Sequence, residues 1–405
     1  MQTQIIDSFK QTPQGREADR ILRSCVHCGF CTATCPTYQL LGDELDGPRG
    51  RIYLIKQVLE GKNASYKTLS HLDRCLTCRS CETTCPSGVE YARLLDIGRQ
   101  QVESQVSRPL FNRVERHLLH WVLSHPKRFA TLHKLSGLLK PLLPKKYQLP
   151  THTTPIITVN PRQHERFVIL LPGCVQPTLD PNINSATEKV LDKLGLRCIS
   201  LPETTCCGAI SHHANKHKAA LKVMEQNIDA WWPYLADPHC EAIVSNASGC
   251  GITLKDYAKY FKDDPRYADK AQAISDKVRD ISEVVSQASD LNPLKLTKPL
   301  RVALHPPCTL QHGLKLKPTL EQLLVQLGFE LLPVQDSHLC CGSAGTYSIL
   351  QPKLSTQLQQ NKLHHLQQHQ PSYIVTANIG CQHHLQAGTD TPVQHWVETL
   401  ATHLS

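Results

Sequence analysis

The sequence contains no hydrophobic run long enough to cross a membrane. The most apolar stretches, such as FVILLPG at residues 167–173, fall far short of the roughly 20 residues that a spanning helix needs. Charged side chains are scattered through the first 24 residues without an apolar core segment, so we expect no secretory signal. We therefore expect a cytoplasmic protein, and a reducing compartment disfavours structural disulfides.

Nucleotide-binding loops are also missing. The sequence has no GxGxxG opening a strand-turn-helix unit and no Walker-type loop, so we expect a catalytic flavin to be bound by another chain. The net charge of +9 is not accompanied by a base-stacking or groove-reading motif, which argues against nucleic-acid binding.

Acidic residues are absent from residues 116–164. This stretch holds eight basic residues: Arg116, Lys127, Arg128, Lys134, Lys140, Lys145, Lys146 and Arg162. We expect a linker with short helices, and two interpretations stay open. It could lie on anionic lipid, or it could be a solvated connector that packs on a partner subunit.

Cysteine is abundant, and eight of the 18 cysteines form two similar runs. The runs are CVHCGFCTATCP at residues 25–36 and CLTCRSCETTCP at residues 75–86. All four cysteines repeat at an offset of 50: Cys25, Cys28, Cys31 and Cys35, then Cys75, Cys78, Cys81 and Cys85. This spacing, closed by proline, is typical of bacterial ferredoxins, in which the fourth cysteine of each run binds the other cluster.

The spacing therefore predicts two [4Fe-4S] clusters with exchanged ligands. One set is Cys25, Cys28, Cys31 and Cys85, and the other is Cys75, Cys78, Cys81 and Cys35. Zinc is the alternative, but zinc sites usually use two short Cys-x-x-Cys pairs.

The segment between the runs predicts a helical type of ferredoxin. In RGRIYLIKQVLEGK, the residues Ile52, Ile55, Val58 and Leu59 recur at helical spacing and the pattern stops near Gly61. This module resembles the iron–sulfur domain of succinate dehydrogenase and fumarate reductase, which is an electron relay. We expect no catalytic residue in this chain.

A second repeat fills the rest of the chain. PGC, TCCG and ASGC at residues 172–174, 205–208 and 247–250 reappear as PPC, LCCG and NIGC at residues 306–308, 339–342 and 378–381. Short apolar runs alternate with helical patterns, so we expect two tandem α/β domains with buried parallel strands, related by duplication. The predicted domains are residues 1–110, a linker at 111–165, and cysteine-rich domains at 166–295 and 296–405.

The cysteines of this second repeat allow three interpretations. They are Cys174, Cys206, Cys207 and Cys250, then Cys308, Cys340, Cys341 and Cys381. Each adjacent pair could form a strained, reducible disulfide, could ligate metal beside the following glycine, or could be buried packing. Cys198 and Cys240 have no counterpart in the other repeat, and we expect them to be packing residues.

Taken together, these motifs resemble the family of glycolate oxidase (glycolate dehydrogenase) iron–sulfur subunits over essentially the full length. The resemblance rests on the two ferredoxin runs, HLDRCLTCRSCETTCPSG, NIDAWWP, SHLCCGSAGTY and VTANIGCQ. It implies an FAD-containing catalytic subunit that oxidises glycolate to glyoxylate, and a further flavoprotein-like subunit. It also implies electron transfer to the quinone pool from the cytoplasmic face of the inner membrane. Related subunits serve D-lactate or glycerol 3-phosphate.

The cysteine-rich domains also resemble those of heterodisulfide reductase, which leaves a reductase as the alternative function. The fuller motif of that family ends in Cys-x-x-Cys and holds a noncubane cluster. Here Cys250 and Cys381 lack that second cysteine, so the fifth ligand is absent from both repeats, although His383 or His384 could substitute.

Overall fold

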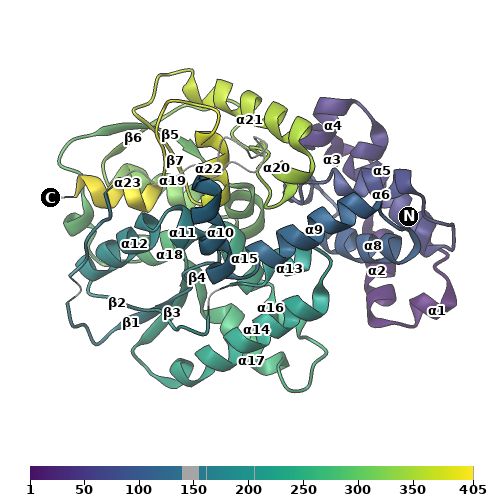
Figure 1. Cartoon of the computed structure of the whole chain (residues 1–405), viewed down its shortest axis with the longest axis horizontal. Coiled ribbons are helices and arrows are strands. Elements are labelled where there is room, and N and C mark those ends of the chain that lie inside the picture. The colour runs from purple at the N-terminus through teal and green to yellow at the C-terminus, as the bar shows by residue number, and fades with distance from the viewer. Residues whose placement is uncertain (139–154, 161, 205, 405) are drawn as a thin grey trace. The chain divides into compact units, whose positions relative to one another are not determined.

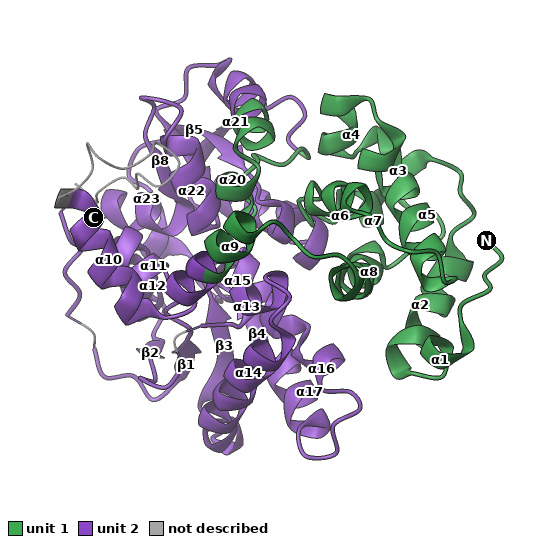
Figure 2. Ribbon diagram, turned by 45° about the vertical axis from the view of Figure 1, so that its right-hand side comes forward, with its two compact units in different colours: residues 1–117, 338–358 green, residues 118–337, 359–405 purple. Residues whose placement is uncertain are grey.

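The computed structural model describes residues 1–138, 155–160, 162–204 and 206–404, which pack into two compact units (Figures 1 and 2). Unit 1 contains residues 1–117 and 338–358, and unit 2 contains residues 118–337 and 359–405. Part of the expected basic linker, including Lys140, Lys145 and Lys146, lies outside the described residues.

Unit 1 is helical. Its N-terminal helices are α1 (Asp7–Lys10), α2 (Pro13–Ser24), α3 (Phe30–Ala33), α4 (Pro36–Leu41), α5 (Pro48–Leu59), α6 (Tyr66–Asp73), α7 (Ser80–Thr84) and α8 (Tyr91–Gln105), with a short turn η1 (Glu44–Asp46). The helix expected between the cysteine runs is α5. Its buried Ile55 packs on α8 at Gly98, where an added Cβ would come within 2.5 Å of the Ile55 side chain.

The offset of 50 residues is visible in the backbone of unit 1. His27 and Thr77 have φ values of 63° and 54°, and Gly29 and Arg79 have values of 89° and 60°. The two equivalent threonines also meet, because the Thr84 hydroxyl donates to Thr34 Oγ1 at 3.1 Å. Each cysteine run therefore makes the same left-handed turns before the short helix that follows it.

Unit 2 contains two parallel four-stranded sheets with the same topology. The first has the order β2-β1-β3-β4 and the second β6-β5-β7-β8. The strands are β1 (Phe167–Leu170), β2 (Arg197–Ile199), β3 (Cys240–Ser245), β4 (Val278–Asp280), β5 (Leu300–His305), β6 (Phe329–Leu332), β7 (Tyr373–Thr376) and β8 (Val393–His395). The predicted fold class, a helical module followed by duplicated α/β domains, is confirmed.

Helices cover these sheets, as the apolar periodicity between the strands requires (Figure 1). In the first repeat they are α11 (Gln176–Leu179), α12 (Asn182–Lys193), α13 (Ala209–His213), α14 (His217–Trp231), α15 (Ser248–Lys255), α16 (Tyr257–Tyr260), α17 (Ala268–Lys277) and α18 (Ile281–Ser286). In the second they are α19 (Lys317–Gln326), α22 (Ile379–Gln386), α23 (Trp396–His403) and the end of α21 (Pro352–Gln367), whereas α20 (Tyr347–Leu350) and the start of α21 belong to unit 1. Helices α9 (Leu110–Leu123) and α10 (Pro126–Leu138) precede β1.

The two repeats share one hydrophobic core within unit 2. Val168 and Val244 of the first sheet belong to the same buried cluster as Val302 and Val375 of the second. Polar contacts also join the repeats, because the amide of Gln382 donates to the buried carboxylate of Asp180 at 2.6 Å. The two repeats therefore pack against each other and do not form independent domains with separate cores.

Candidate metal centres

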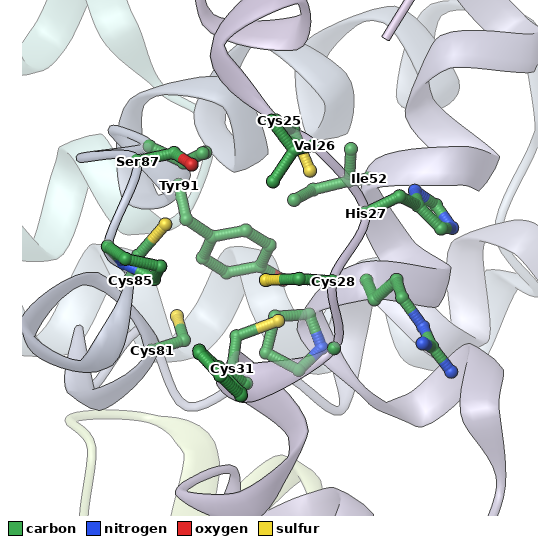
Figure 3. Close-up of a pocket in the computed structure, with 16 residues that line it drawn as sticks. Cys25, Val26, His27, Cys28, Cys31, Ile52, Cys81, Cys85, Ser87 and Tyr91 are labelled. Atoms are coloured by element: carbon green, nitrogen blue, oxygen red, sulfur yellow. The ribbon is translucent and has the colours of Figure 1, made fainter.

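The first pocket of unit 1 is lined by four of the eight ferredoxin cysteines that the sequence grouped together. Cys25, Cys28, Cys31 and Cys85 surround it, and Cys81 also reaches its wall. Figure 3 shows the sulfur atoms of this set turned toward the pocket interior. Gly29 has a φ of 89°, and a Cβ there would come within 2.7 Å of Arg49 Nη1, so the turn favours glycine.

The second pocket brings together the remaining cysteines. It is lined by Cys35, Cys75, Cys78 and Cys81, so the fourth cysteine of each run lies with the first three of the other. The pKa of the Cys81 thiol is raised by burial and then by the charges of Cys78, Cys75, Glu82 and Cys35.

The donor sets suit iron–sulfur clusters. In the first pocket, burial and then the neighbouring Cys25 raise the pKa of Cys31 to about 11, because several thiolates cannot lie together without a cation. Four thiolates from a spacing of this type are the ligand set of a [4Fe-4S] cluster, which when bound supplies one-electron redox chemistry. Binding would require the thiols to lose their protons.

A buried polar network surrounds the second pocket. The fully buried carboxylate of Asp46 is 2.7 Å from Arg74 Nη1, 3.0 Å from His71 Nδ1 and 3.5 Å from Arg51 Nη2. Arg51 itself lines the pocket. Two donors also reach sulfur, because the Thr77 amide lies 3.4 Å and the Tyr91 hydroxyl 3.6 Å from Cys75 Sγ. This second layer was not found from the sequence.

The first pocket has a more open rim. Cys28 is the exposed member of its cysteine set, and Val26 and Phe30 beside it are 66% and 62% exposed. Its arginine, Arg49, is paired with Glu44 at 2.6 Å near solvent. The two pockets therefore share a ligand pattern but differ in exposure and charge.

The first cysteine-rich repeat gathers its four cysteines in unit 2. Hydrogen bonding to Cys206 raises the pKa of Cys174, and contacts with Cys206 and then Cys250 raise the pKa of Cys207. The pKa of Cys206 is lowered, because its sulfur accepts from the Cys174 and Cys207 thiols. All four are free thiols. The four cysteines form no disulfide with one another, and thiolate sulfurs gathered in this way are the donors that soft metal ions prefer.

The Cys-Cys-Gly turn has the same geometry in both repeats. The amides of Gly208 and Gly342 lie 3.4 Å from the sulfurs of Cys206 and Cys340. Both glycines have φ near 90°, at 91° and 92°.

The second repeat divides its cysteines between the units. Cys308 and Cys381 belong to unit 2, whereas Cys340 and Cys341 belong to unit 1. Within unit 2, a ring nitrogen of His305 lies within 4.8 Å of Cys381 Sγ. His305 is fully buried, and neither of its ring nitrogens has a hydrogen-bond partner among the described residues. Sequence reasoning missed it, although the alignment of the repeats places it opposite Leu171.

The two unmatched cysteines lie in apolar surroundings. Cys198 packs against one hydrophobic core cluster and Cys240 is buried in another. This agrees with the expectation that they are packing residues.

Comparison with family models defines the class of protein. A 4Fe-4S dicluster domain matches residues 21–89, and a cysteine-rich domain matches residues 168–255 and again 302–386. The chain is therefore an iron–sulfur protein in which a dicluster module precedes two cysteine-rich domains.

The relatives narrow this class to one family. The chain is 52% identical over 402 residues to the glycolate oxidase iron-sulfur subunit of Escherichia coli, covering 99% of this chain and 98% of the relative. It is 31% identical to a probable glycolate oxidase iron-sulfur subunit of Bacillus subtilis, covering 96% and 92%. The chain belongs to the family of glycolate oxidase iron–sulfur subunits, and its 4Fe-4S domain fits an electron-transfer role.

A more distant relative matches over a shorter stretch. The lactate utilization protein A of Geobacillus thermodenitrificans is 27% identical over 240 residues, covering 58% of this chain and 98% of the relative.

Proposed function

We propose that this chain transfers electrons within a complex that oxidises glycolate to glyoxylate. In this proposal Cys25, Cys28, Cys31 and Cys85 hold one [4Fe-4S] cluster, and Cys75, Cys78, Cys81 and Cys35 hold the other. The observation that carries it is the pair of pockets, each lined by three cysteines of one run and the fourth cysteine of the other, with Cys81 also at the wall of the first pocket. Glycolate is favoured over D-lactate or glycerol 3-phosphate by the 52% identity to the E. coli subunit.

Substrate chemistry belongs to other chains in this proposal. An FAD-containing catalytic subunit would oxidise glycolate, a further flavoprotein-like subunit would complete the complex, and the electrons would pass to the quinone pool. Cys28 and its apolar neighbours Val26 and Phe30 form the most open edge of the first pocket, which supports electron entry there.

Metal analysis of anaerobically purified protein tests this assignment. About eight irons with matching acid-labile sulfide per chain are expected for two cubane clusters. Zinc without sulfide would overturn the assignment. After reconstitution with the catalytic subunit, glycolate should reduce the clusters. The loss of their visible absorbance measures this reduction. Reduction by D-lactate but not by glycolate would replace the proposed substrate.

The cysteine-rich repeats are the second candidate site. We infer that Cys174, Cys206, Cys207 and Cys250 bind an additional metal, because the four sulfurs interact with one another in one cluster, in which all but Cys250 are buried. Iron or zinc beyond the two cubanes, lost in Cys207→Ser, is the expected result. In the second repeat, His305 is a stronger candidate than His383 or His384 for a nitrogen ligand, because its buried ring lies beside Cys381.

Helix α9 supports peripheral attachment to a membrane. Its residues Leu110, Phe111, Val114, Leu118 and Trp121 are all more than 40% exposed, and Arg113 is exposed among them. An amphipathic basic helix of this kind can bury its apolar face at an anionic lipid surface. Among the described residues no helix is both long and apolar enough to span a bilayer.

Liposome flotation tests the attachment. The wild-type chain should float with vesicles that contain anionic lipid, and the Phe111→Ser and Arg113→Glu variants should float less. Equal flotation of all three proteins would exclude α9 as the lipid contact.

A further inference from the structure

We propose that Arg51 makes the second pocket the site of higher reduction potential. Reduction adds one negative charge to a cluster, so a permanent positive charge held close by stabilises the reduced form. The Arg51 side chain is 1% exposed and lines the second pocket together with Cys35 and Cys75. This inference rests on the proposed function, because it assumes that each pocket binds a cluster.

Arg51 is fixed by neutral acceptors on most of its donors. Its Nε donates to the carbonyl of His71 at 2.8 Å, and both terminal nitrogens lie 3.2 Å from the Thr37 hydroxyl. Its only carboxylate partner among the described residues is Asp46, at 3.5 Å. A guanidinium held mainly by neutral groups keeps its charge available to the pocket.

Asp46 does not neutralise this charge, because it is shared. Arg74 lies closer to the same carboxylate, at 2.7 Å, so two guanidinium groups face one carboxylate. Burial alone would lower the pKa of Arg51, but Cys75, Tyr91, Cys35 and Asp46 together raise it above its ordinary value. The guanidinium therefore interacts electrostatically with Cys75 and Cys35, two of the cysteines that would hold the cluster whose negative charge grows on reduction.

The other charged groups near the second pocket do not reverse the positive electrostatic potential that Arg51 creates there. The acidic side chain of Glu82 raises the pKa of Cys81, after burial and the charges of Cys78 and Cys75. Two further arginines oppose it: Arg79 lines the pocket, and Arg99 Nη2 donates to the carbonyl of Cys75 at 2.9 Å. Hydrogen bonds to Cys75 Sγ from Thr77 and Tyr91 act in the same direction, since donors to sulfur raise the potential.

The first pocket lacks a comparable buried charge in the described residues. Its arginine, Arg49, is 33% exposed and pairs one-to-one with Glu44, so solvent and the carboxylate both weaken its field. Exposure of Cys28 acts the other way, because water also stabilises the reduced form. We expect the buried charge to dominate, since Coulomb interactions are far stronger in the interior than at the surface.

The consequence is a direction for electron transfer. An electron that enters at the open rim of the first pocket would move to the second with a favourable free energy. Arg51 acts here as a positioning residue that tunes the cluster electrostatically and does not touch any substrate.

Redox titration monitored by electron paramagnetic resonance tests the proposal on the full chain with both clusters assembled. Arg51→Gln should move one of the two reduction waves to lower potential, and Arg51→Lys, which keeps the charge, should move it much less. The matched control Arg49→Gln should leave that wave in place. In a Cys85→Ser background only the second pocket keeps four cysteines, so the wave that survives identifies it.

Removal of the counter-charge provides a change of opposite sign. Asp46→Asn should move the same wave to higher potential, which also decides the question if Arg51→Gln fails to assemble. Equal shifts in Arg51→Gln and Arg51→Lys, or no shift in any Arg51 and Asp46 variant, would overturn the inference. Absence of both clusters from the wild-type chain would instead overturn the proposed function.

Discussion

In the helical module the two cysteine runs exchange their last members, so that Cys35 and Cys85 each line the pocket of the other run. In the first cysteine-rich repeat, by contrast, Cys174, Cys206, Cys207 and Cys250 all come from one repeat. Both regions repeat a cysteine motif in sequence. A repeated cysteine motif can therefore either place one cysteine of each copy in the pocket of the other or keep all the cysteines of a copy together.

The exchange of the last cysteines between the runs predicts the largest effect of mutation. Cys85→Ser should abolish the cluster of the first pocket, although Cys85 belongs to the second run, and Cys35→Ser should abolish the other. Each variant should lose up to roughly four irons, because the affected pocket no longer offers the four thiolates that hold a [4Fe-4S] cluster. Iron analysis and the power saturation of the remaining resonance signal measure this.

The control for this experiment lies in the tandem repeats. Cys207→Ser should leave the iron of both proposed [4Fe-4S] clusters intact, because Cys207 lines neither of the two pockets. If Cys85→Ser changed the same resonance signal as Cys75→Ser, the exchange would be wrong.

Salt bridges between Asp73 and two arginines should stabilise the helical module. Asp73 lies 2.5 Å from Arg108 and 2.9 Å from Arg116, and it is mostly buried. Burial raises the pKa of Asp73, but the hydrogen bond from Arg108 and the charge of Arg116 outweigh burial and lower it below 3.8. Its stabilisation is therefore complete above about pH 4 and is lost as the pH falls through the lowered value.

We expect Asp73→Asn to destabilise the module by about 3 kcal/mol at pH 7, since it leaves Arg116 without its carboxylate and removes one of the two carboxylates that pair with Arg108. Urea unfolding followed by cluster absorbance measures this difference. A difference that did not shrink on acidification would show that the ionised carboxylate is not the cause.

The tandem repeats should respond to pH with the opposite sign. Glu398 is buried, and burial followed by the charge of Asp180 raises its pKa to about 8. A carboxyl whose folded pKa is raised costs stability as the pH rises from its unfolded value toward the folded one. Glu398→Gln removes this cost. The free energy of unfolding of the variant relative to wild type should therefore increase by at most roughly 1.4 kcal/mol per pH unit between pH 5 and 8.

Unfolding curves of unit 2, followed by tryptophan fluorescence across this range, provide the measurement. Trp231 and Trp396 are both fully buried there and report on the two repeats. A constant difference between Glu398→Gln and wild type at all pH values would contradict the raised pKa.

The smallest effect concerns the two equivalent glycine turns. An added Cβ at Gly342 would approach the Ser355 carbonyl oxygen to 2.6 Å, whereas at Gly208 it would meet the flexible end of Met224 at 3.0 Å. Both substitutions by alanine strain a left-handed residue, at about 1–2 kcal/mol. Gly342→Ala should cost about 1 kcal/mol more, because backbone cannot move aside as a methionine can. Equal losses in thermal unfolding would show that the two turns relax alike.

The sequence predicted the fold class and the grouping of its cysteines because these depend on local spacing. Three features can be recognised without tertiary information: the cysteine runs, the apolar segments of strand length, and the spacing of 134 residues between Cys174 and Cys308. The buried charges were not predicted. Arg51 and Asp46 lie five residues apart near an amphipathic helix, and nothing in their spacing indicates that both side chains are buried.

The domain boundaries proposed from sequence remain a prediction, and one segment illustrates the difficulty. Residues 338–358 belong by sequence to the second cysteine-rich repeat, yet they pack in unit 1 with the helical module. Long-range packing of this kind depends on a few tertiary contacts, which leave no periodic signal. His305 was missed for a different reason: it directly precedes the PPC motif, but the equivalent residue of the first repeat is Leu171, so the comparison of the repeats gives no histidine signal.

The same segment has a consequence for biosynthesis. The buried side chain of Tyr347 donates from its hydroxyl to the carbonyl of Arg74 at 3.1 Å, so a residue made late in translation completes a unit begun at the N-terminus. Chains generally fold N-terminal regions first as they emerge from the ribosome. Here more than two hundred residues separate the N-terminal part of unit 1, which ends at residue 117, from its second segment, which begins at residue 338. The contacts that this segment makes with the helical module can therefore form only after most of the chain has been synthesised.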